Sequence, residues 1–492
     1  MPKRPVVLSS SVTKVDFESD CACSTHSRHL VPDHPELVEN WIYKINNEFY
    51  RKQILPDFSF YYSLKNPSGI VVLDTHAESI LNRFYEPKEI NAVADVSSCD
   101  HEEEYQTIIK LINSKLLVSA VALSPDQTPR EGDQLSEELT VWLHITNQCN
   151  LRCEYCFVDK TIHKMSTDTV EKSIDAIFRS AQYNDLKGVK IKYAGGEPTL
   201  NFKVLQHAHE YAKDKFVNSE ITVKEIVLTN ATHLNPEMVD YLKDNSIQVM
   251  VSLDGLGEYN DVQRHSLSGR GSFQNIEAGL RLLASREILP TISITISNKN
   301  CQAVPELTRW LLARELPFTF NFYRENQFSA NIKDLAINDA SIINSLLLAY
   351  NEIENNPPSY SILDMLSDRA QLSASHSHTC GVGSSYLVID HDGQVSKCHM
   401  LLHQPITTIY TENPLRVARN DTESIQNPSV ESKLECNKCD WRYVCTGGCP
   451  ALTYRATGRF DVKSPNCSIY KSIFPRILEV EAIRLLKREN YC

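Results

Sequence analysis

The chain has 492 residues, a length that fits about two to four domains rather than one. Hydrophobic residues make up 42% and charged residues 23%, with 16 Gly and 22 Pro, which excludes intrinsic disorder, collagen-like repeats and low-complexity architectures. The net charge of -12, from 50 Lys and Arg against 62 Asp and Glu, disfavours non-specific binding to a phosphate backbone, so we expect no nucleic-acid partner.

The apolar segments are short. None of them reaches the ~18 to 20 residues of a membrane helix, and the basic start Met1-Pro2-Lys3-Arg4 is not followed by the apolar core of a signal peptide. We therefore expect no membrane partner and a cytoplasmic location. A reducing cytosol disfavours disulfides, so the clustered members of the 15 cysteines are expected to bind metal or redox centres.

The N-terminal region, residues 1–130, begins with a helical pattern near 35–51. Alternating hydrophobicity then predicts a hairpin from residues 58–64 and 70–73, joined by Asn66-Pro67-Ser68-Gly69. Helical patterns at 77–84 and around 108–112 and a short apolar run at 116–118 follow. This order predicts a winged-helix-like module over about residues 56–120.

A polar stretch at 129–138 is predicted to be a linker, after which strand and helix patterns alternate through residues 131–325. The predicted strands are residues 140–145, 189–193, 222–228, 247–253, 291–296 and 318–322. The predicted helices are residues 169–182, 202–216, 236–243, 273–285 and 304–313. A closed eightfold barrel needs about 250 residues, so this span predicts an α/β fold with a partial (β/α)6 TIM-like barrel and functional groups at the carboxyl ends of its strands.

Two segments complete the predicted organisation. Residues 326–375 have a polar helical pattern, broken by Asn355-Asn356-Pro357-Pro358, and are predicted to form a helical linker. Residues 376–492 contain eight of the 15 cysteines and are predicted to form a separate C-terminal cysteine-rich iron-sulfur domain.

The first cysteine group directly follows the first barrel strand, with the spacing Cys149-x3-Cys153-x2-Cys156. A structural zinc site prefers four closed ligands, and no fourth cysteine lies nearby in the sequence. Three thiolates on a cubane 4Fe-4S cluster would instead leave one iron open to a substrate or cosubstrate. The spacing therefore predicts an iron-sulfur cluster.

This spacing, with Tyr155 before the third cysteine, resembles the signature of the radical S-adenosylmethionine (SAM) superfamily. The resemblance implies that the open iron binds S-adenosylmethionine and that the reduced cluster cleaves it to methionine and a 5'-deoxyadenosyl radical. It also implies that this radical abstracts hydrogen from a substrate.

Other segments at predicted strand ends fit the same resemblance. Gly195-Gly196-Glu197-Pro198 is similar to the family's glycine-rich motif, whose backbone approaches the methionine moiety while the carboxylate accepts from its ammonium group. Asn230 ends the third strand, and the resemblance places Ser252 and Arg264 near the cosubstrate carboxylate. All seven residues are predicted to bind the cosubstrate.

The C-terminal cysteines form a second pattern. The spacing is Cys380-x12-Gly393-x4-Cys398, then Cys436-x2-Cys439-x5-Cys445-x3-Cys449, then Cys467. Cys436-x2-Cys439 alone also fits a zinc knuckle. The complete order resembles the SPASM extension of radical SAM enzymes, which houses two auxiliary 4Fe-4S clusters, so three clusters are expected in total.

The resemblance assigns Cys436, Cys439, Cys445 and Cys467 to one auxiliary cluster. It assigns Cys380, Cys398 and Cys449 to the other, which is then one ligand short. The fourth position is either open to a substrate group such as a thiolate or filled from one of four residues: His376, His378, His399 or Cys301. An open iron could hold a substrate sulfur, whereas a closed cluster could only transfer electrons.

Auxiliary clusters suit a net oxidation, because a substrate radical must lose an electron before it forms a new bond. SPASM enzymes largely modify peptides, and residues 58–119 loosely resemble an element that binds a leader peptide by strand addition. We therefore expect a radical SAM/SPASM peptide maturase that installs a thioether or carbon-carbon crosslink. Its partners would be a ribosomal precursor peptide, bound through its leader, and an electron donor such as flavodoxin or ferredoxin.

Two alternatives stay open. One is an anaerobic sulfatase-maturing, formylglycine-forming enzyme, although that family carries an Asp base directly after the second cysteine of the C-terminal module, where this chain has His399. The other is a non-catalytic, metal-stabilised peptide-binding protein, which leaves the motif of Cys149, Cys153 and Cys156 beside Gly195-Gly196-Glu197-Pro198 unexplained.

Overall fold

The structure is a computed structural model, and it describes residues 5–10, 42–93, 101–120 and 136–492. The first part of the predicted 35–51 helix and most of the predicted 129–138 linker lie outside these ranges. In the ranges described, no helix combines the length and the apolar character needed to cross a bilayer.

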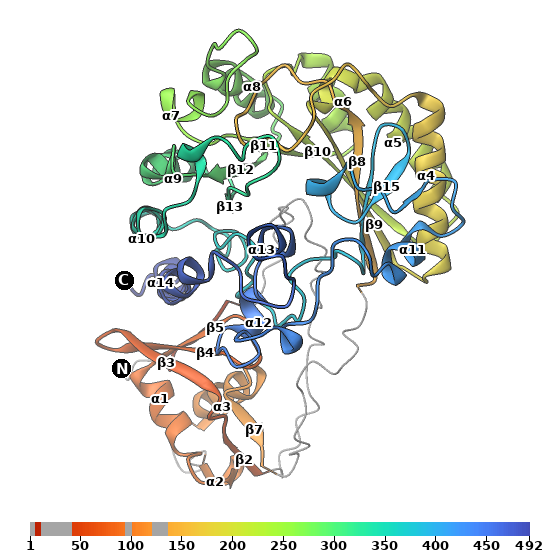
Figure 1. Ribbon diagram of the computed structural model, residues 1–492. Helices are drawn as coiled ribbons and strands as arrows, with labels where there is room; N and C mark the ends of the chain where they lie inside the picture. Colours follow the sequence, from red (N-terminus) through yellow and green to blue (C-terminus); the bar gives the residue numbers. More distant parts are fainter. Residues whose placement is uncertain (1–4, 11–41, 94–100, 121–135) are drawn as a thin grey trace.

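A curved sheet of parallel strands forms the centre of the molecule. Six of its strands follow each other in chain order: β8 (Glu138–Thr146), β9 (Gly188–Gly195), β10 (Thr222–Thr229), β11 (Gln248–Ser252), β12 (Thr291–Ile296) and β13 (Phe318–Phe322). The helices between them cover the outer side of the sheet (Figure 1): α4 (Thr167–Tyr183), α5 (Phe202–Phe216), α6 (Pro236–Asp244), α8 (Phe273–Ser285) and α9 (Val304–Leu312). Parallel pairing of each strand with the next confirms the predicted partial (β/α)6 barrel.

Local sequence explains these elements well. Strand β8 is buried on both faces, so residues 139–145 appear as a largely apolar run. Two of these helices begin at side-chain caps: Ser166 accepts from the Thr169 amide before α4, and Asn235 accepts from the Met238 amide before α6. Pro236 occupies the first turn of α6, where its missing N–H costs no hydrogen bond.

The sheet continues beyond β8 into the C-terminal segment. Strand β14 (Tyr386–Ile389) pairs in parallel with β8, and the antiparallel strands β15 (Gln394–Ser396) and β16 (Thr407–Thr408) complete a nine-stranded sheet. The cysteine-rich segment thus shares a sheet with the barrel instead of standing apart from it.

The predicted helical segment at 326–375 contains one α-helix, α10 (Asp339–Asn355), followed by irregular chain. This helix packs against α9 and against the long C-terminal helix α14 (Cys467–Arg488), and Leu346 and Tyr350 are completely buried in the contact. The region is therefore part of the core. Four short helices complete the α-helices of residues 136–492: α7 (Glu258–Asp261), α11 (Pro414–Asn420), α12 (Arg442–Cys445) and α13 (Pro450–Thr457).

The N-terminal module contains two small sheets. One has the order β1 (Val7–Ser9), β5 (Ile70–Asp74), β4 (Phe58–Ser63), β3 (Phe49–Leu55), and the other has the order β6 (Lys88–Glu89), β2 (Ile42–Ile45), β7 (Leu117–Ser119). Three helices pack on them: α1 (Thr75–Asn82), α2 (Ile90–Val93) and α3 (His101–Asn113). The predicted hairpin is confirmed as β4 and β5.

The predicted helix at 35–51 is wrong over its described part, because residues 42–45 and 49–51 belong to strands β2 and β3. Aromatic and β-branched residues such as Ile42, Tyr43 and Phe49 favour strands, and cross-strand pairing with β7 and β4 decides the outcome.

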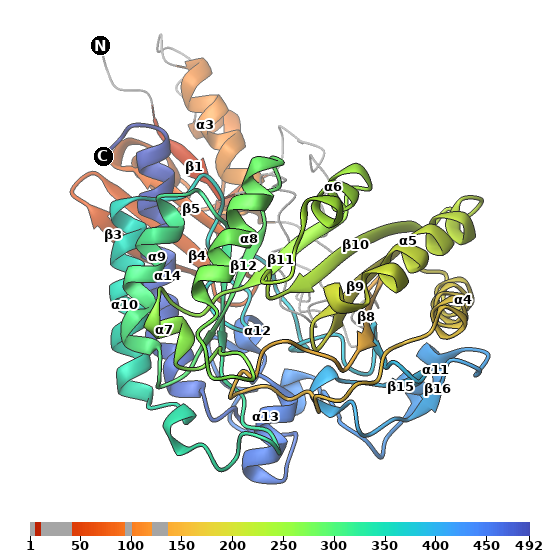
Figure 2. The ribbon, with the colours of Figure 1, turned by 90° about the horizontal axis from the view of Figure 1, so that it is seen from above.

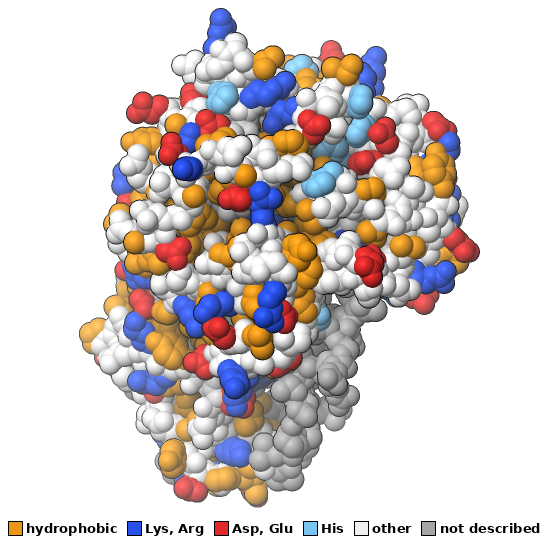
Figure 3. Space-filling model, in the orientation of Figure 1, with side chains coloured by type: hydrophobic (Ala, Val, Ile, Leu, Met, Phe, Trp, Pro, Cys, Tyr) orange, Lys and Arg blue, Asp and Glu red, His pale blue; other side chains and the backbone are white. Residues whose placement is uncertain are grey.

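The N-terminal module rests on α14, which lies between it and the barrel (Figures 1 and 2). Phe60 and Tyr62 from β4 are completely buried, and the Tyr62 hydroxyl donates to the Leu372 carbonyl oxygen at 3.0 Å. On the face seen in Figure 3, acidic and basic side chains are interspersed over both parts of the molecule, and hydrophobic side chains gather around the middle.

Candidate functional site

The first three cysteines lie in the loop that follows β8. The amides of Arg152 and Glu154 donate to the carbonyl oxygens of His265 and Gln263 at 2.6 and 3.0 Å, which fixes the loop against the segment after α7. Burial raises the pKa of Cys149 to about 12, and the negative charges of Glu197 and of the other two thiolates act in the same direction. All three cysteines are half-buried. A thiol with a raised pKa becomes a thiolate when it binds a cationic centre, and an iron-sulfur core supplies one.

Glycine packing holds this loop in place. A Cβ atom on Gly195 would lie 2.4 Å from the Thr146 carbonyl oxygen, and one on Gly196 would lie 2.3 Å from that of Gln148. The Gly196 amide also donates to Thr146 O at 2.7 Å. In this structure the two glycines therefore allow β9 to approach the residues directly before Cys149.

Glu197 is completely buried and connects two barrel strands. One carboxylate oxygen accepts from the Thr199 amide and from the hydroxyls of Thr199 and Thr229, at 3.2, 2.7 and 2.7 Å. The other oxygen accepts from the Asn230 amide at 2.7 Å. These contacts connect the end of β9 to the end of β10, and the role of Glu197 toward a cosubstrate ammonium group stays a prediction. Pro198 begins the short helix η1 (Pro198–Asn201) directly after it.

Asn230 belongs to a polar network that sequence reasoning did not find. Its side-chain amide donates to Asn150 Oδ1 at 2.9 Å, and the Asn150 amide donates to the Thr232 hydroxyl at 2.7 Å. Asn150 follows Cys149, so the network attaches the cysteine loop to the end of β10. Only the position of Asn150 beside Cys149 could have indicated this role.

A buried charged group connects the cysteine loop to the segments that follow β11 and α7. Tyr155 donates to Asp254 Oδ2 at 2.6 Å and accepts from the Arg264 guanidinium, which lies 3.6 Å from the same carboxylate. Burial raises the pKa of Cys153, whereas the positive charge of Arg264 lowers it. The Arg264 guanidinium therefore favours the thiolate form that a cluster requires.

Arg264 also has one buried N–H group that donates no hydrogen bond within the described residues. Its side chain is 6% exposed, and its Nε has no hydrogen-bond partner. Ser252 is half-buried at the carboxyl end of β11. A buried guanidinium N–H without a partner fits an anionic group such as the cosubstrate carboxylate, which agrees with the predicted role of Arg264.

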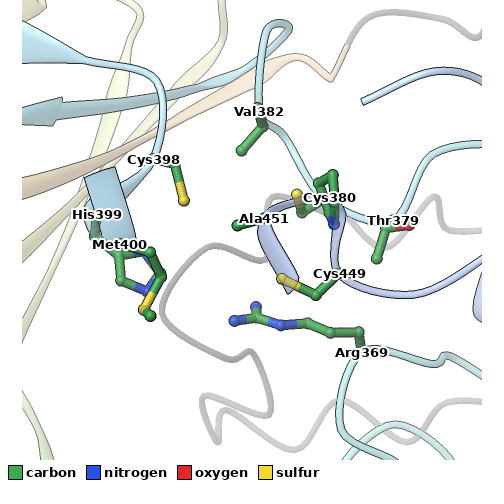
Figure 4. A pocket seen from close by; sticks show the side chains of 10 residues that line it. Arg369, Thr379, Cys380, Val382, Cys398, His399, Met400, Cys449 and Ala451 are labelled. Atoms are coloured by element: carbon green, nitrogen blue, oxygen red, sulfur yellow. The ribbon is translucent and has the colours of Figure 1, made fainter. Parts of the chain in front are cut away.

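The structure brings Cys380, Cys398 and Cys449 together around one hollow (Figure 4). Cys398 lies directly before the short helix η4 (His399–Leu401), and Cys449 directly before α13. The other residues around the hollow are Arg369, Thr379, Val382, His399, Met400, Pro450 and Ala451. These three thiols are the set that sequence reasoning assigned to the incomplete auxiliary cluster.

His399 is the one of the four candidate fourth ligands that lines this hollow. Its ring stacks on Trp142, with ring centroids 4.7 Å apart, and its Nδ1 lies 3.0 Å from the Tyr386 hydroxyl. Burial and the nearby guanidinium of Arg369 hold the pKa of His399 well below its usual range, so the imidazole is neutral. Neither Trp142 nor Tyr386 carries a sequence signal that would have placed it here.

The remaining four predicted ligands, Cys436, Cys439, Cys445 and Cys467, surround a second hollow. Burial, together with the charges of the other three thiolates, raises the pKa of Cys445 to about 12. Within the ranges described, no three His, Cys, Asp or Glu side chains converge closely enough to share a single metal ion. A cubane binds each thiolate through a different iron, so its ligands do not have to converge on one ion.

Residues 143–300 match the sequence profile of the radical SAM superfamily. This match includes the cysteine loop, Gly195-Gly196-Glu197-Pro198 and the buried group around Arg264. The chain therefore contains a radical SAM domain, which implies a 4Fe-4S cluster and bound S-adenosylmethionine.

Similar proteins cover larger parts of the chain. An uncharacterised protein of Methanocaldococcus jannaschii, MJ0907, is 33% identical over 35% of this chain, and the match spans 57% of its own length. A cysteine-type anaerobic sulfatase-maturating enzyme of Clostridium novyi is 25% identical over 62% of this chain and 85% of its own.

Two solved structures show the same fold. The enzyme anSMEcpe with bound AdoMet superimposes with a TM-score of 0.58 at 18% identity, covering 70% of this chain and 99% of its own. SuiB of Streptococcus suis, bound to its precursor peptide SuiA, superimposes with a TM-score of 0.51 at 15% identity and covers 86% of this chain and 99% of its own.

Proposed function

We propose that this protein is a radical SAM enzyme with two auxiliary 4Fe-4S clusters that crosslinks a ribosomal precursor peptide. The main observation in support is that ten cysteines, separated by up to 318 residues, gather into the three groups expected from their spacing. Cys149, Cys153 and Cys156 would hold the cluster that cleaves S-adenosylmethionine. Gly195, Gly196, Glu197, Pro198, Asn230, Ser252 and Arg264 would surround this cosubstrate.

Two auxiliary clusters account for the electrons of such a reaction. A thioether or carbon-carbon crosslink removes two hydrogens from the peptide: one is abstracted by the 5'-deoxyadenosyl radical, and the other leaves as a proton and an electron. The ligand sets would be Cys436, Cys439, Cys445 and Cys467 for one cluster and Cys380, Cys398 and Cys449 for the other. When bound, these clusters would provide a one-electron path away from the substrate.

The N-terminal module supports a peptide substrate. Strand β3 is the last strand of its sheet, and its residues Tyr50–Gln53 are exposed to solvent. In the ranges described, no strand pairs with its outer edge, so a leader peptide could add a strand there. SuiB, which has the same fold, was crystallised with a precursor peptide.

Formylglycine formation is a second candidate, favoured by the sulfatase-maturating relatives. The two activities use different peptides and give different products. Incubation with a cysteine-containing sulfatase peptide would yield formylglycine in one case. Co-production with a precursor encoded beside this gene would yield a peptide lighter by two hydrogens in the other.

The first experiment is metal analysis and electron paramagnetic resonance of the anaerobically reconstituted chain and of a C149A/C153A/C156A variant. We expect about twelve irons in the native chain, about eight in the variant, and 5'-deoxyadenosine only from the native chain. The control is C492A, since Cys492 is an exposed thiol outside the three groups and its loss should leave about twelve irons. Bound zinc without cleavage of S-adenosylmethionine would instead indicate a metal-stabilised binding protein.

A further inference from the structure

Lys433 is a buried cation between the two C-terminal cysteine groups. Its side chain is 1% exposed, and its ammonium donates to the Thr446 carbonyl oxygen at 2.7 Å. In the described parts of the chain, no carboxylate lies within salt-bridge distance of it. A buried charge without a counter-charge is strongly destabilising, so this site requires a negative partner.

The surrounding loop connects both hollows to this ammonium. Gly447, which lines the hollow of Cys436, has a φ of +83°, and a Cβ atom there would lie 2.7 Å from Lys433 Cδ and 3.4 Å from Cys436 Sγ. On the other side, the Thr379 hydroxyl, beside Cys380, lies 3.2 Å from the Thr446 carbonyl oxygen that also accepts from Lys433.

Thiolates from both groups act on this ammonium. Burial lowers the pKa of Lys433, and the negative charges of Cys436 and Cys445 from one group and of Cys380 and Cys449 from the other act against this lowering. An ammonium has three N–H donors, and Thr446 uses one of them. The other two are available to sulfur atoms of a bound cluster.

We propose that Lys433 is a counter-cation shared by the two auxiliary clusters and that it raises the reduction potential of both. This inference rests on the proposed function, because it requires both clusters. Net charge and hydrogen bonds to sulfur are two of the ways in which a protein sets cluster potentials, and a buried cation acts through both. Lys433 thus acts by holding a positive charge near both clusters, and this charge makes both clusters better electron acceptors.

The test is a redox titration, followed by electron paramagnetic resonance, of the full-length C149A/C153A/C156A chain, in which only auxiliary clusters give signals. We expect K433M to keep about eight irons and to shift both midpoints to lower potential, and K433R to restore both. The control is K65M, because Lys65 is an exposed cation that lines neither hollow and its loss should leave both midpoints unchanged.

Each other outcome has a defined meaning. Unchanged midpoint potentials in K433M, or a shift in the midpoint potential of only one cluster, would overturn the proposal that Lys433 is a counter-cation shared by both clusters. Loss of iron in K433M that K433R restores would support it, whereas loss that K433R does not restore would show that Lys433 only packs the loop. Absence of auxiliary clusters from the chain with Lys433 intact would overturn the proposed function instead.

Discussion

Single residues around the cysteine loop set the charge that its thiols experience. Tyr155, Asp254 and Arg264 form one hydrogen-bonded, charged group, and the positive charge of Arg264 acts on Cys153. The cysteine spacing indicates an iron-sulfur site. The group of Tyr155, Asp254 and Arg264 adds a positive charge that favours the thiolate form of Cys153. Residues far apart in the sequence provide it, at the ends of different strands.

Replacing Gly196 by alanine should displace the loop that carries Cys149, because the new Cβ would lie 2.3 Å from a backbone oxygen that cannot rotate away. We expect G196A to lower the free energy of unfolding by about 1–3 kcal/mol and to lose the barrel cluster. Urea denaturation and iron content would measure both effects. In the control G188A, the new Cβ meets only side-chain atoms at 3.2 to 3.5 Å, so equal losses in the two variants would contradict this explanation.

The buried pair of His209 and Glu225 should make stability depend on pH. The hydrogen bond that His209 Nδ1 donates to the Glu225 carboxylate, 2.6 Å away, raises the pKa of His209 above its ordinary value of 6.5. The folded protein therefore holds this proton more tightly than the unfolded chain does. The stabilisation is complete below about pH 6.5 and is lost as the pH rises through the raised pKa.

We expect H209Q to remove this part of the pH dependence. Urea midpoints of the native chain and of the variant, measured from pH 5.5 to 8.5, would show it as a difference that shrinks with rising pH. The more exposed pair of His207 and Glu171, with side chains 36% and 42% exposed, provides the control variant H207Q. A constant difference between the native chain and H209Q across this range would contradict the assignment.

At the scale of elements, the irregular segment after α10 connects the barrel to the C-terminal helix. Arg324, after β13, donates twice to Asp368, at 2.7 and 2.9 Å, and Tyr470 of α14 donates to the same carboxylate at 2.7 Å. Asp368 also accepts from the Phe322 amide. A single buried carboxylate thus attaches three segments to one another.

Changing Asp368 to asparagine should leave the Arg324 charge buried without its partner, since the Asp368 side chain has no solvent exposure. We expect D368N to cost about 3–5 kcal/mol in the free energy of unfolding. The control D461N breaks the exposed pair with Arg459, which solvent screens, so it should cost much less than D368N. Chemical denaturation of both variants gives the comparison, and a small effect of D368N would show that solvent reaches this pair.

The strands and helices of the barrel follow from local sequence, because caps, prolines and apolar runs mark most of their ends to within two residues. The error at 42–51 shows where local signals fail. Ile42, Tyr43 and Phe49 fit either periodicity over so short a stretch, and only pairing with distant strands makes them β.

At the scale of the whole molecule, the C-terminal segment completes the barrel. Strand β14 covers the edge of β8, and α14 covers one face of α10 and supports the N-terminal sheet. The molecule therefore has one large continuous core, which includes residues from β4, the barrel and α14. The cysteine-rich segment is therefore packed on the same core as the barrel.

A chain that ends at residue 375 should therefore fail to fold cooperatively, because it would expose the edge of β8 and the apolar face of α10. We expect no sigmoidal unfolding transition by circular dichroism. A control chain that ends at Glu489 retains α14 and should unfold cooperatively. A stable, monomeric 1–375 chain would show instead that the barrel folds without the C-terminal segment.

The sequence by itself determined the class of chemistry, because ligand spacing, glycine motifs and strand order are local properties of the chain. It predicted the ten cysteines, their grouping and the partial barrel. Only the tertiary structure decided that β14 extends the barrel sheet, that His399 lies beside Cys380, Cys398 and Cys449, and that Lys433 lies between two thiol groups. These features arise from contacts between distant segments, and burial, which gives each of them its energetic consequence, exists only in the folded chain.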